Sequence, residues 1–442
     1  MKKLALSLAG ALAATAFAPE ASAVPAFARQ TGMACSACHY QHFPLLNGFG
    51  RAFKSSGFTL MGAQGRIEGD NNLSIPDTVN MGVFTTAYFQ TQGHEKVAGV
   101  DKGADQGLGK WGVPGTGGEL SLFIGGRVTE FAGFLAEAGL GGDGTARTSV
   151  VGPAKLALLF PVGDYRVGAV IYTSPDQGAA YSFETLNTGA VGTHKMMGNT
   201  GPSDQHVQAA YASQYLGTKT AATGINVVAN GDIGFLNLGA YEMAGNDLVG
   251  GANNLDLIYG RLAGTFDIVG WDSGVGVQYF GGKSYVTGGA PGVQNAPKAT
   301  IVDFQMQGDI GTIPTGFYAS YGTASAGTAS EINPFNAHME MVGGAATAVA
   351  GTQNKHSLNV AAEFGVIPHV VTVQVAVRAG KNGAATNNSD NAVMLGVAYE
   401  LAQNMALTFH HTQQSGSAWN ANGAGDELPG KDANTLLLET AF

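Results

Sequence analysis

The residues of this chain best suited to chemistry gather in one short stretch near its start, TGMACSACHYQHFP. Cys35 and Cys38 are the only cysteines among 442 residues, and His39 follows them directly. The spacing C-x-x-C-H is the attachment pattern of a c-type haem, in which two thioethers and the next imidazole reach one macrocycle. We therefore predict a single, covalently attached haem c on Cys35 and Cys38, with His39 as the proximal ligand of the iron.

Two other kinds of site use closely spaced cysteines. A structural zinc site needs four ligands, and the chain has no second cysteine pair. A thiol–disulfide redox pair normally belongs to a βαβ unit, and the sequence has no such pattern around Cys35 and Cys38. Haem c is therefore the favoured interpretation.

The distal side of the haem iron has several candidate ligands. If the stretch after the motif is helical, His42 shares the face of His39 and does not easily reach the far side of the ring. Met61 follows the SSGF turn and could fold back over the haem, and a methionine ligand would raise the reduction potential. We therefore favour Met61 over His42. The remaining candidates are Met33, a lumen histidine such as His206 or His410, and water.

Cations and aromatic rings surround the motif in the sequence. Arg29, Arg51 and Lys54 are candidate partners of the haem propionates, although solvated or lumen-facing charge is an equally weighted alternative. The phenylalanines of this segment are expected to pack against the macrocycle or a surrounding wall; they are Phe27, Phe43, Phe49, Phe53 and Phe58.

An export signal precedes the haem segment. Lys2 and Lys3 are followed by an apolar run, and Ala21-Ser22-Ala23 fits the small-residue cleavage pattern. The run is shorter than the about 20 residues that span a bilayer, which disfavours a membrane anchor. We expect residues 1–23 to be a signal peptide and residues 24–76 to carry the haem, which would be attached in the periplasm. A segment this short cannot bury a haem with its own core, so it must lean on another structure.

The amino-acid composition limits which kinds of protein the remaining chain can be. Charged residues make up 12%, hydrophobic residues 45%, and glycine is frequent at 67 residues. Low charge with high apolar content indicates deep burial or a lipid-facing surface. The net charge of −10 and the pI of about 5.4 argue against a nucleic-acid partner.

From about Val79 onward, short segments alternate strictly in polarity. In IVDFQMQGD, Val302 and Phe304 oppose Asp303 and Gln305, and the same period of two recurs in VVTVQVAVRAGK and NAVMLGVAYE. A soluble β-sandwich also alternates. Here short turns on one side and long loops on the other favour an outer-membrane barrel in contact with lipid. We expect residues 77–442 to be an all-β transmembrane antiparallel barrel of about sixteen strands, or about eighteen depending on residues 217–232. The expected lumen-facing residues are Arg127, Glu137, Asp303, Gln305, Gln374 and Arg378.

The chain ends in TLLLETAF, an alternating segment with a terminal Phe442. Leu436, Leu438, Thr440 and Phe442 lie on one face of this final strand. A C-terminal phenylalanine on such a strand resembles the signal by which outer-membrane barrels are inserted. Together with the strand pattern, it favours a bacterial outer-membrane location over a chance aromatic end.

The haem segment resembles the fused monohaem cytochrome c–porin family, the outer-membrane iron(II) oxidases. The resemblance rests on PAFARQTGMACSACH, FP and GRAFKSSGFTL, within about residues 24–60, and over the barrel on length and strand pattern alone. It implies a sixteen-stranded barrel whose mouth the cytochrome plugs or lines. It also implies extracellular Fe(II) as electron donor, and a periplasmic c-type cytochrome or other electron carrier as acceptor.

Two other functions fit the same residues. One is a diffusion porin whose haem serves only folding or sensing, and the other is an electron conduit for a donor other than iron. Acidic residues in the expected loops suit Fe²⁺, although ordinary solubility is the favoured explanation for them; they are Asp101, Asp105, Asp426 and Glu427.

Overall fold

The computed structural model describes residues 26–62, 64–93, 96–97, 100–101, 110–140, 151–175, 177–189, 211–243, 254–285, 292–342, 345–419 and 431–442. The helical elements are α2 (Ala26–Thr31), α3 (Cys35–Cys38), α4 (Gly48–Ser55), η1 (Ala179–Tyr181), α7 (Ala212–Leu216), η3 (Pro334–Asn336) and η4 (Ser417–Trp419). The strands outside the barrel wall are β1 (Arg66–Gly69), β2 (Leu73–Pro76), β4 (Lys96–Val97), β5 (Val100–Asp101), β16 (Ser284–Tyr285), β17 (Gln294–Asn295), β20 (Glu331–Ile332), β21 (Ala337–Val342) and β22 (Ala345–Ala350).

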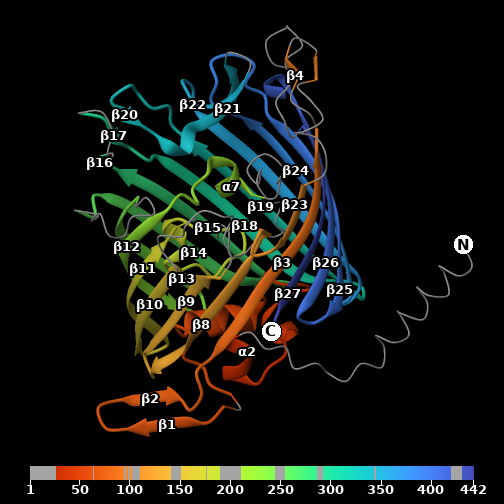
Figure 1. Ribbon diagram of the computed structural model, residues 1–442. Helices are drawn as coiled ribbons and strands as arrows, with labels where there is room; N and C mark the ends of the chain where they lie inside the picture. Colours follow the sequence, from red (N-terminus) through yellow and green to blue (C-terminus); the bar gives the residue numbers. More distant parts are fainter. Residues whose placement is uncertain are drawn as a thin grey trace, which may run out of the picture.

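The remaining strands form the wall of a closed barrel (Figure 1). They are β3 (Met81–Gln92), β6 (Lys110–Pro114), β7 (Gly117–Gly118), β8 (Leu120–Thr129), β9 (Ala132–Gly139), β10 (Val151–Val162), β11 (Tyr165–Ser174), β12 (Ala222–Gly231), β13 (Gly234–Glu242), β14 (Leu257–Ile268), β15 (Trp271–Gly282), β18 (Ala299–Ile310), β19 (Ile313–Ala324), β23 (Lys355–Ile367), β24 (Val371–Lys381), β25 (Asn391–Ala402), β26 (Met405–Ser415) and β27 (Asp432–Ala441). Apart from the short parallel contact between β6 and β7, neighbouring wall strands pair antiparallel, and β27 pairs with β3 to close the ring.

The wall contains sixteen strands, which confirms the lower of the two expected counts. Both β6 and β8 pair with β3, at Tyr88↔Gly112 and Thr85↔Leu120 respectively. β6, β7 and β8 are therefore pieces of one interrupted strand. The ambiguous segment 217–232 supplies a single wall strand, β12, which is already part of the sixteen.

The alternation predicted from the sequence separates a polar interior from an apolar exterior. On β18, Asp303 and Gln305 are buried in the lumen, whereas Val302 points outward and is 48% exposed. On β24 and β25 the valines likewise face outward, and Gln374 and Arg378 face inward. An apolar outer face and a polar inner face are typical of barrels that stand in a lipid bilayer.

The two ends of the barrel differ in their connections. The turns at Gly163–Asp164, Asp232–Ile233, Val269–Gly270 and Gly311–Thr312 are short. The long connections that carry β21 and β22 lie at the opposite end (Figure 1). In outer-membrane barrels the short turns face the periplasm and the long loops face outside the cell. The expected division of turns and loops is confirmed, and further long connections join β9 to β10 and β13 to β14.

Aromatic rings lie on the outer surface near both ends of the barrel. Toward the short turns, Trp271 stacks on Phe317, and Phe131 stacks on Phe160. Toward the long loops, Tyr279 and Tyr321 are exposed on the outer face. Two aromatic girdles flanking an apolar band mark the two interfaces of a membrane. The chain is therefore a bacterial outer-membrane β-barrel, as the sequence predicted.

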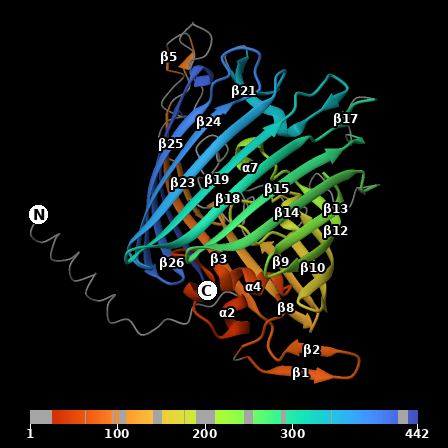
Figure 2. The same cartoon turned by 180° about the vertical axis from the view of Figure 1, so that it is seen from behind.

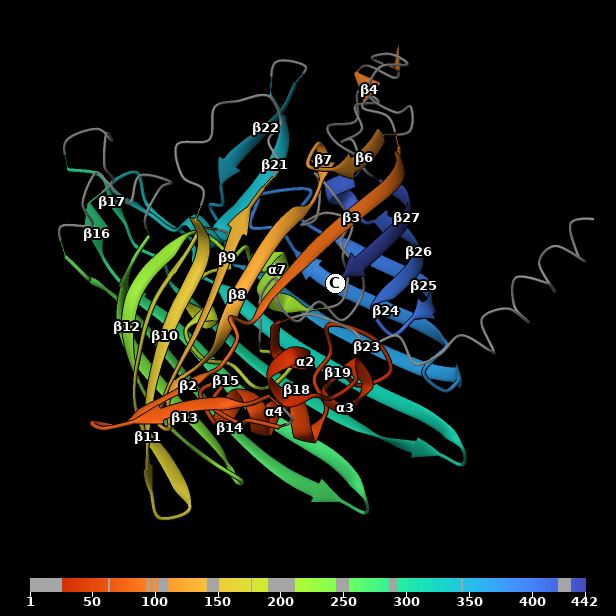
Figure 3. The same cartoon turned by 60° about the horizontal axis from the view of Figure 1, so that its bottom comes forward.

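Two segments lie within or across the lumen. Residues 26–62, which we call the plug, carry α2, α3 and α4 and close the short-turn mouth, while the hairpin β1–β2 projects beyond it (Figures 1 and 3). Residues 177–189 and 211–221, which we call the insert, run inside the barrel between β11 and β12, with α7 inside the ring of strands (Figure 2). The plug therefore lies at the end of the barrel that carries the short turns (Figures 1 and 3).

Several expectations lie outside the described residues. They concern the signal peptide, His206, Asp105, Asp426 and Glu427, together with the side chain of Asp101. Among the described residues, no helix has both the length and the apolarity needed to cross a membrane.

Candidate functional site

The C-x-x-C-H motif forms one helical turn followed by an extended residue. Cys35 and Cys38 are the ends of α3, and the backbone N–H of His39 donates to the Cys35 carbonyl (2.9 Å). The Nδ1 atom of His39 lies 3.1 Å from the Leu45 carbonyl. Because a carbonyl only accepts, Nδ1 must carry the proton, which leaves the lone pair on Nε2. Burial lowers the pKa of His39 to about 4, so the ring is neutral at physiological pH.

The two thiols are half-buried and are not joined to each other. Burial, reinforced by the carboxylate of Glu400, raises the pKa of Cys35 to about 11, and burial also raises the pKa of Cys38. A redox-active C-x-x-C pair needs a cysteine whose pKa is lowered. The surroundings of this pair therefore disfavour the thiol–disulfide alternative.

Helix α4 holds the motif in place through Asn47 and Gly50. The Asn47 side chain caps α4 by accepting from the Gly50 N–H (2.9 Å), and it donates to the Ala37 carbonyl (3.0 Å). A Cβ atom at Gly50 would lie 2.2 Å from the Cys38 carbonyl oxygen, so only glycine permits this close approach. Asn47 is absent from the sequence-based predictions, although an asparagine before an amphipathic GFGRAFKS segment is an N-cap signal.

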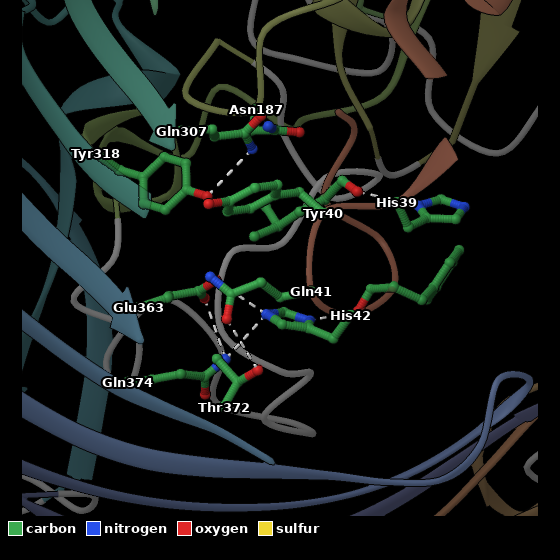
Figure 4. Close-up of polar contacts among 12 residues, drawn as sticks. His39, Tyr40, Gln41, His42, Asn187, Gln307, Tyr318, Glu363, Thr372 and Gln374 are labelled. Carbon is green, nitrogen blue, oxygen red and sulfur yellow. Dashed lines mark hydrogen bonds and ion pairs between the residues drawn. The ribbon is translucent and has the colours of Figure 1, made fainter. Parts of the chain in front are cut away.

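His42 is turned toward the barrel wall instead of the region around His39 (Figure 4). Its Nε2 lies 3.0 Å from Glu363 of β23 and 3.2 Å from the side-chain nitrogen of Gln374. Burial disfavours the charged ring, but the carboxylate of Glu363 outweighs it and raises the pKa of His42 to about 9. His42 is thus the charged half of a buried ion pair. His410, another distal-ligand candidate, lies on the wall in the same network and contacts Gln374 at 2.8 Å.

The two residues before His42 also bind the wall. The hydroxyl of Tyr40 lies 2.7 Å from the Gly308 carbonyl, and the Gln41 side-chain oxygen accepts from Thr372 (3.3 Å). Residues 40–42 therefore form a continuous anchor to strands β18, β23 and β24. Sequence reasoning could not find these contacts, because their partners lie 268 to 332 positions away.

The other predicted site residues are spread over the plug. Arg29 is exposed on α2, and Met61 is half-buried beyond Leu60, whose carbonyl accepts from Gln30 (2.7 Å). Arg51 forms an ion pair with Asp272 at the start of β15. Burial lowers the pKa of Lys54 to about 8, against the opposing charge of Glu184 in the insert. Arg51 and Lys54 thus interact with the wall and the insert, and their pairing with propionates stays a prediction.

The insert touches both the wall and the plug. Arg261 of β14 is paired with Glu184 of the insert and Asp303 of β18, all three being buried. Asn187 of the insert accepts from the Leu46 N–H (2.8 Å) and donates to the Leu46 carbonyl (3.0 Å). The segment that carries the C-x-x-C-H motif is therefore held from inside the lumen as well as from the wall.

Across the described ranges, no three or more His, Cys, Asp or Glu side chains are grouped as they would be around a metal ion. The motif itself supplies two thiols and the His39 imidazole. These three are the donor set that a c-type haem requires.

Comparison with known proteins identifies the architecture. No protein-family model matches the chain, and no curated protein matches it. OprB of Pseudomonas putida is similar in structure with a TM-score of 0.50 and 10% identity, over 82% of this chain and 94% of that one. DcaP of Acinetobacter baumannii (TM-score 0.47, 10% identity, 85% and 99% covered) and Salmonella typhi OmpF in complex with daunomycin (0.48, 12%, 86% and 100%) also match. At such identity the similarity concerns the fold alone, and the chain has a porin-like outer-membrane barrel.

Proposed function

We propose that this barrel is an outer-membrane electron carrier with one c-type haem attached to Cys35 and Cys38. His39 is the proximal ligand. The observation that carries the proposal is the geometry of the motif: two unpaired thiols end one helical turn, and the next imidazole donates Nδ1–H to the Leu45 carbonyl. This hydrogen bond fixes the tautomer whose Nε2 can bind a metal. When bound, the haem supplies a one-electron change at its iron.

The chain's own residues orient and shield this group. Asn47 and Gly50 fix α3 against α4, and the anchor of residues 40–42 seats the motif against the wall. The barrel thus supplies the burial that a plug of this length lacks. As distal ligand we retain Met61 ahead of His42, because both ring nitrogens of His42 already lie within hydrogen-bond distance of protein atoms.

The donor is extracellular Fe(II) and the acceptor is a periplasmic c-type cytochrome or other electron carrier. Lipid excludes aqueous ferrous iron, so Fe(II) approaches from the long-loop side, and because the insert lies inside the barrel (Figure 2), the electron and not the ion covers the last part of the path to the plug. The plug lies at the short-turn mouth, which a periplasmic carrier can approach. This arrangement supports passage of electrons inward. The same geometry would serve an electron donor other than iron.

A diffusion porin is the second candidate, and the porin-like fold favours it. Against it, the plug and the insert both occupy the lumen and contact each other through Leu46 and Asn187. A haem used only for folding or sensing would account for the motif under this alternative. The two candidates differ in whether the haem exchanges electrons with Fe²⁺.

Purified full-length protein tests the proposal. The pyridine haemochrome spectrum should show one covalent haem per chain, and Fe²⁺ should reduce the oxidised haem, as followed by the Soret band. A Cys35→Ala variant should lose covalent haem, whereas Ser36→Ala, in the same turn, should keep it. Failure of Fe²⁺ to reduce a properly attached haem would overturn iron as the donor. Rapid solute uptake by proteoliposomes, without any electron uptake, would favour the porin.

A further inference from the structure

Four phenylalanines of the plug divide into two groups with different surroundings. Phe27, Phe53 and Phe58 pack on one another, with ring centroids 4.9 Å, 5.0 Å and 6.1 Å apart. Phe53 and Phe58 are buried, and Phe58 lies 5.6 Å from the ammonium group of Lys155 on the wall. These three rings form a core within the plug.

Phe43 belongs to the second group. It is 45% exposed, and its ring stands edge-on to the ring of His39 at 5.2 Å. It also contacts Phe84 of β3 at 5.7 Å, and Phe84 contacts Phe123 of β8 at 6.4 Å. A row of three phenylalanines therefore runs from His39 to the barrel wall.

Phe84 and Phe123 face the lumen. Thr86 and Gln90, which share the face of Phe84, are buried inside the barrel, and so is Ser121, which shares the face of Phe123. Both phenylalanines are only half-buried. Their strands adjoin the closing seam of the barrel, where β27 pairs with β3 and Phe442 exchanges backbone hydrogen bonds with Val83.

We propose that the haem pocket is shared between plug and barrel, with Phe84 and Phe123 forming the wall against which the haem packs beside Phe43. The inference rests on the proposed function. A porphyrin presents two large apolar faces, and the plug's other buried rings are engaged in its own core. Aromatic side chains cover such faces effectively, because they bury much area at fixed geometry. The barrel therefore controls access of water to the haem, and through it the reduction potential.

The test uses the full-length chain carrying Phe84→Ala, Phe123→Ala or the milder Phe84→Leu. Phe89→Ala is the matched control, because Phe89 lies on the same strand but faces outward against Trp111 (4.7 Å). Heat-modifiable migration on gels reports whether each barrel has closed. The readouts are covalent haem content, the Soret circular dichroism and the reduction potential.

We expect covalent haem to be retained in every variant, because the thioethers do not involve the wall. Phe84→Ala and Phe123→Ala should lose most of the induced Soret dichroism and should lower the potential, since water then reaches the ring. Phe84→Leu should show a smaller change, and it replaces the alanine variant if that barrel does not close. Phe89→Ala should match the wild type.

Different results would overturn the proposed function and the shared pocket. If the wild-type chain carries no covalent haem, the proposed function is overturned and the shared pocket with it. If the haem is attached but Phe84 and Phe123 variants match Phe89→Ala in both dichroism and potential, the shared pocket is overturned while the electron-carrier function stands.

Discussion

Among the described residues, the ion pair of His42 and Glu363 is more deeply buried than the other plug–wall ion pair, Arg51–Asp272. The side chains of His42 and Glu363 are 6% and 0% exposed, and Nε2 of His42 lies 3.0 Å from Oε2 of Glu363. A buried pair adds little net stability compared with apolar replacements, but removal of one partner leaves a charge without compensation. Removal of one partner should therefore destabilise the seated plug more than removal of both, and single and double substitutions can measure the difference.

The His42→Ala variant should therefore loosen the plug. The buried carboxylate of Glu363 loses its counter-charge, and we expect a loss of about 3–5 kcal/mol in the stability of the seated plug. Limited proteolysis of the plug in detergent checks this. His411→Ala is the control, because His411 lies on the outward face beside Asn434. A His42→Ala/Glu363→Gln double variant should recover part of the loss, and equal protease resistance of His42→Ala and wild type would refute the role of the pair.

The same pair predicts how plug seating depends on pH. The pKa of His42 is raised from its ordinary value of 6.5 to about 9 in the folded protein, with Glu363, Gln374, His410 and Glu400 around it. The stabilising contribution is thus complete below about pH 6.5 and is lost as pH rises through about 9. Proteolysis from pH 6 to 10 should show the plug becoming labile near the upper end, and His42→Gln should remove that step. A step that persists in His42→Gln would assign it to another group.

At this scale the sequence predicts a haem attachment site, which stays a prediction, but not the contacts that hold the motif in place. The C-x-x-C-H spacing is local, so Cys35, Cys38 and His39 could be identified without a fold. The functions of His42, Tyr40 and Arg51 depend on Glu363, Gly308 and Asp272, which only the closed barrel brings near them. Such partners have no local sequence signal.

At the scale of elements, the backbone of the plug at Gly57 packs directly against the backbone of strand β9 at Gly133. A Cβ atom at Gly133 would lie 1.8 Å from the carbonyl oxygen of Gly57 in the plug. Backbone atoms on both sides cannot rotate away as a side chain could. The fit of the plug against the wall thus depends on a glycine that belongs to the barrel.

Gly133→Ala should displace the plug without changing any plug residue. Overpacking of this kind costs about 1–3 kcal/mol, and here the plug can yield by moving outward. Increased protease sensitivity of the plug, with unchanged heat-modifiable migration of the barrel, is the expected result. Gly264→Ala is the matched control, because its nearest neighbour would be 3.8 Å away. A plug that stays equally protected in both variants would contradict the contact.

The elements themselves were predictable to different degrees. Strands such as β18 and β24 alternate with a period of two, and that pattern is dictated by which face meets lipid. The sequence predicts a long loop wherever strands are not closely joined, and the insert belongs to such a connection, yet its Tyr181, Phe183 and Leu186 are buried inside the barrel. These apolar residues were the available signal, since an external loop has no need of them. The interruption of β8 by β6 and β7 has no comparable signal.

At the scale of the whole molecule, the orientation of the barrel in the outer membrane determines whether the plug faces the periplasm or the outside of the cell. The short turns and the plug share one end of the barrel, and the long connections share the other (Figure 1). An epitope inserted after Thr352, between β22 and β23, should bind antibody on intact cells. The same epitope inserted at Gly163, where a Cβ meets nothing within 4 Å, should bind only after the outer membrane is permeabilised. The reverse pattern would place the plug outside the cell and reverse the proposed direction of electron flow.

The plug enters the lumen from the short turns and the insert fills it from within, and the two meet where Asn187 binds both backbone groups of Leu46. We expect the two segments to act on solutes as two obstacles in series, because each is held to the wall by buried charges, His42–Glu363 for the plug and Arg261 with Glu184 and Asp303 for the insert. Removing one obstacle should have a modest effect on flow, and removing both a large one.

We expect planar-bilayer conductance to be low for the wild type, slightly higher for Gly133→Ala or for Glu184→Gln alone, and more than additive when the two are combined. Glu184→Gln weakens the insert's hold, because Arg261 then keeps only Asp303 as a charged partner. Gly264→Ala should conduct like the wild type. High conductance already in the wild type would mean that the lumen is open despite both segments, and it would shift the balance from an electron carrier to a diffusion porin.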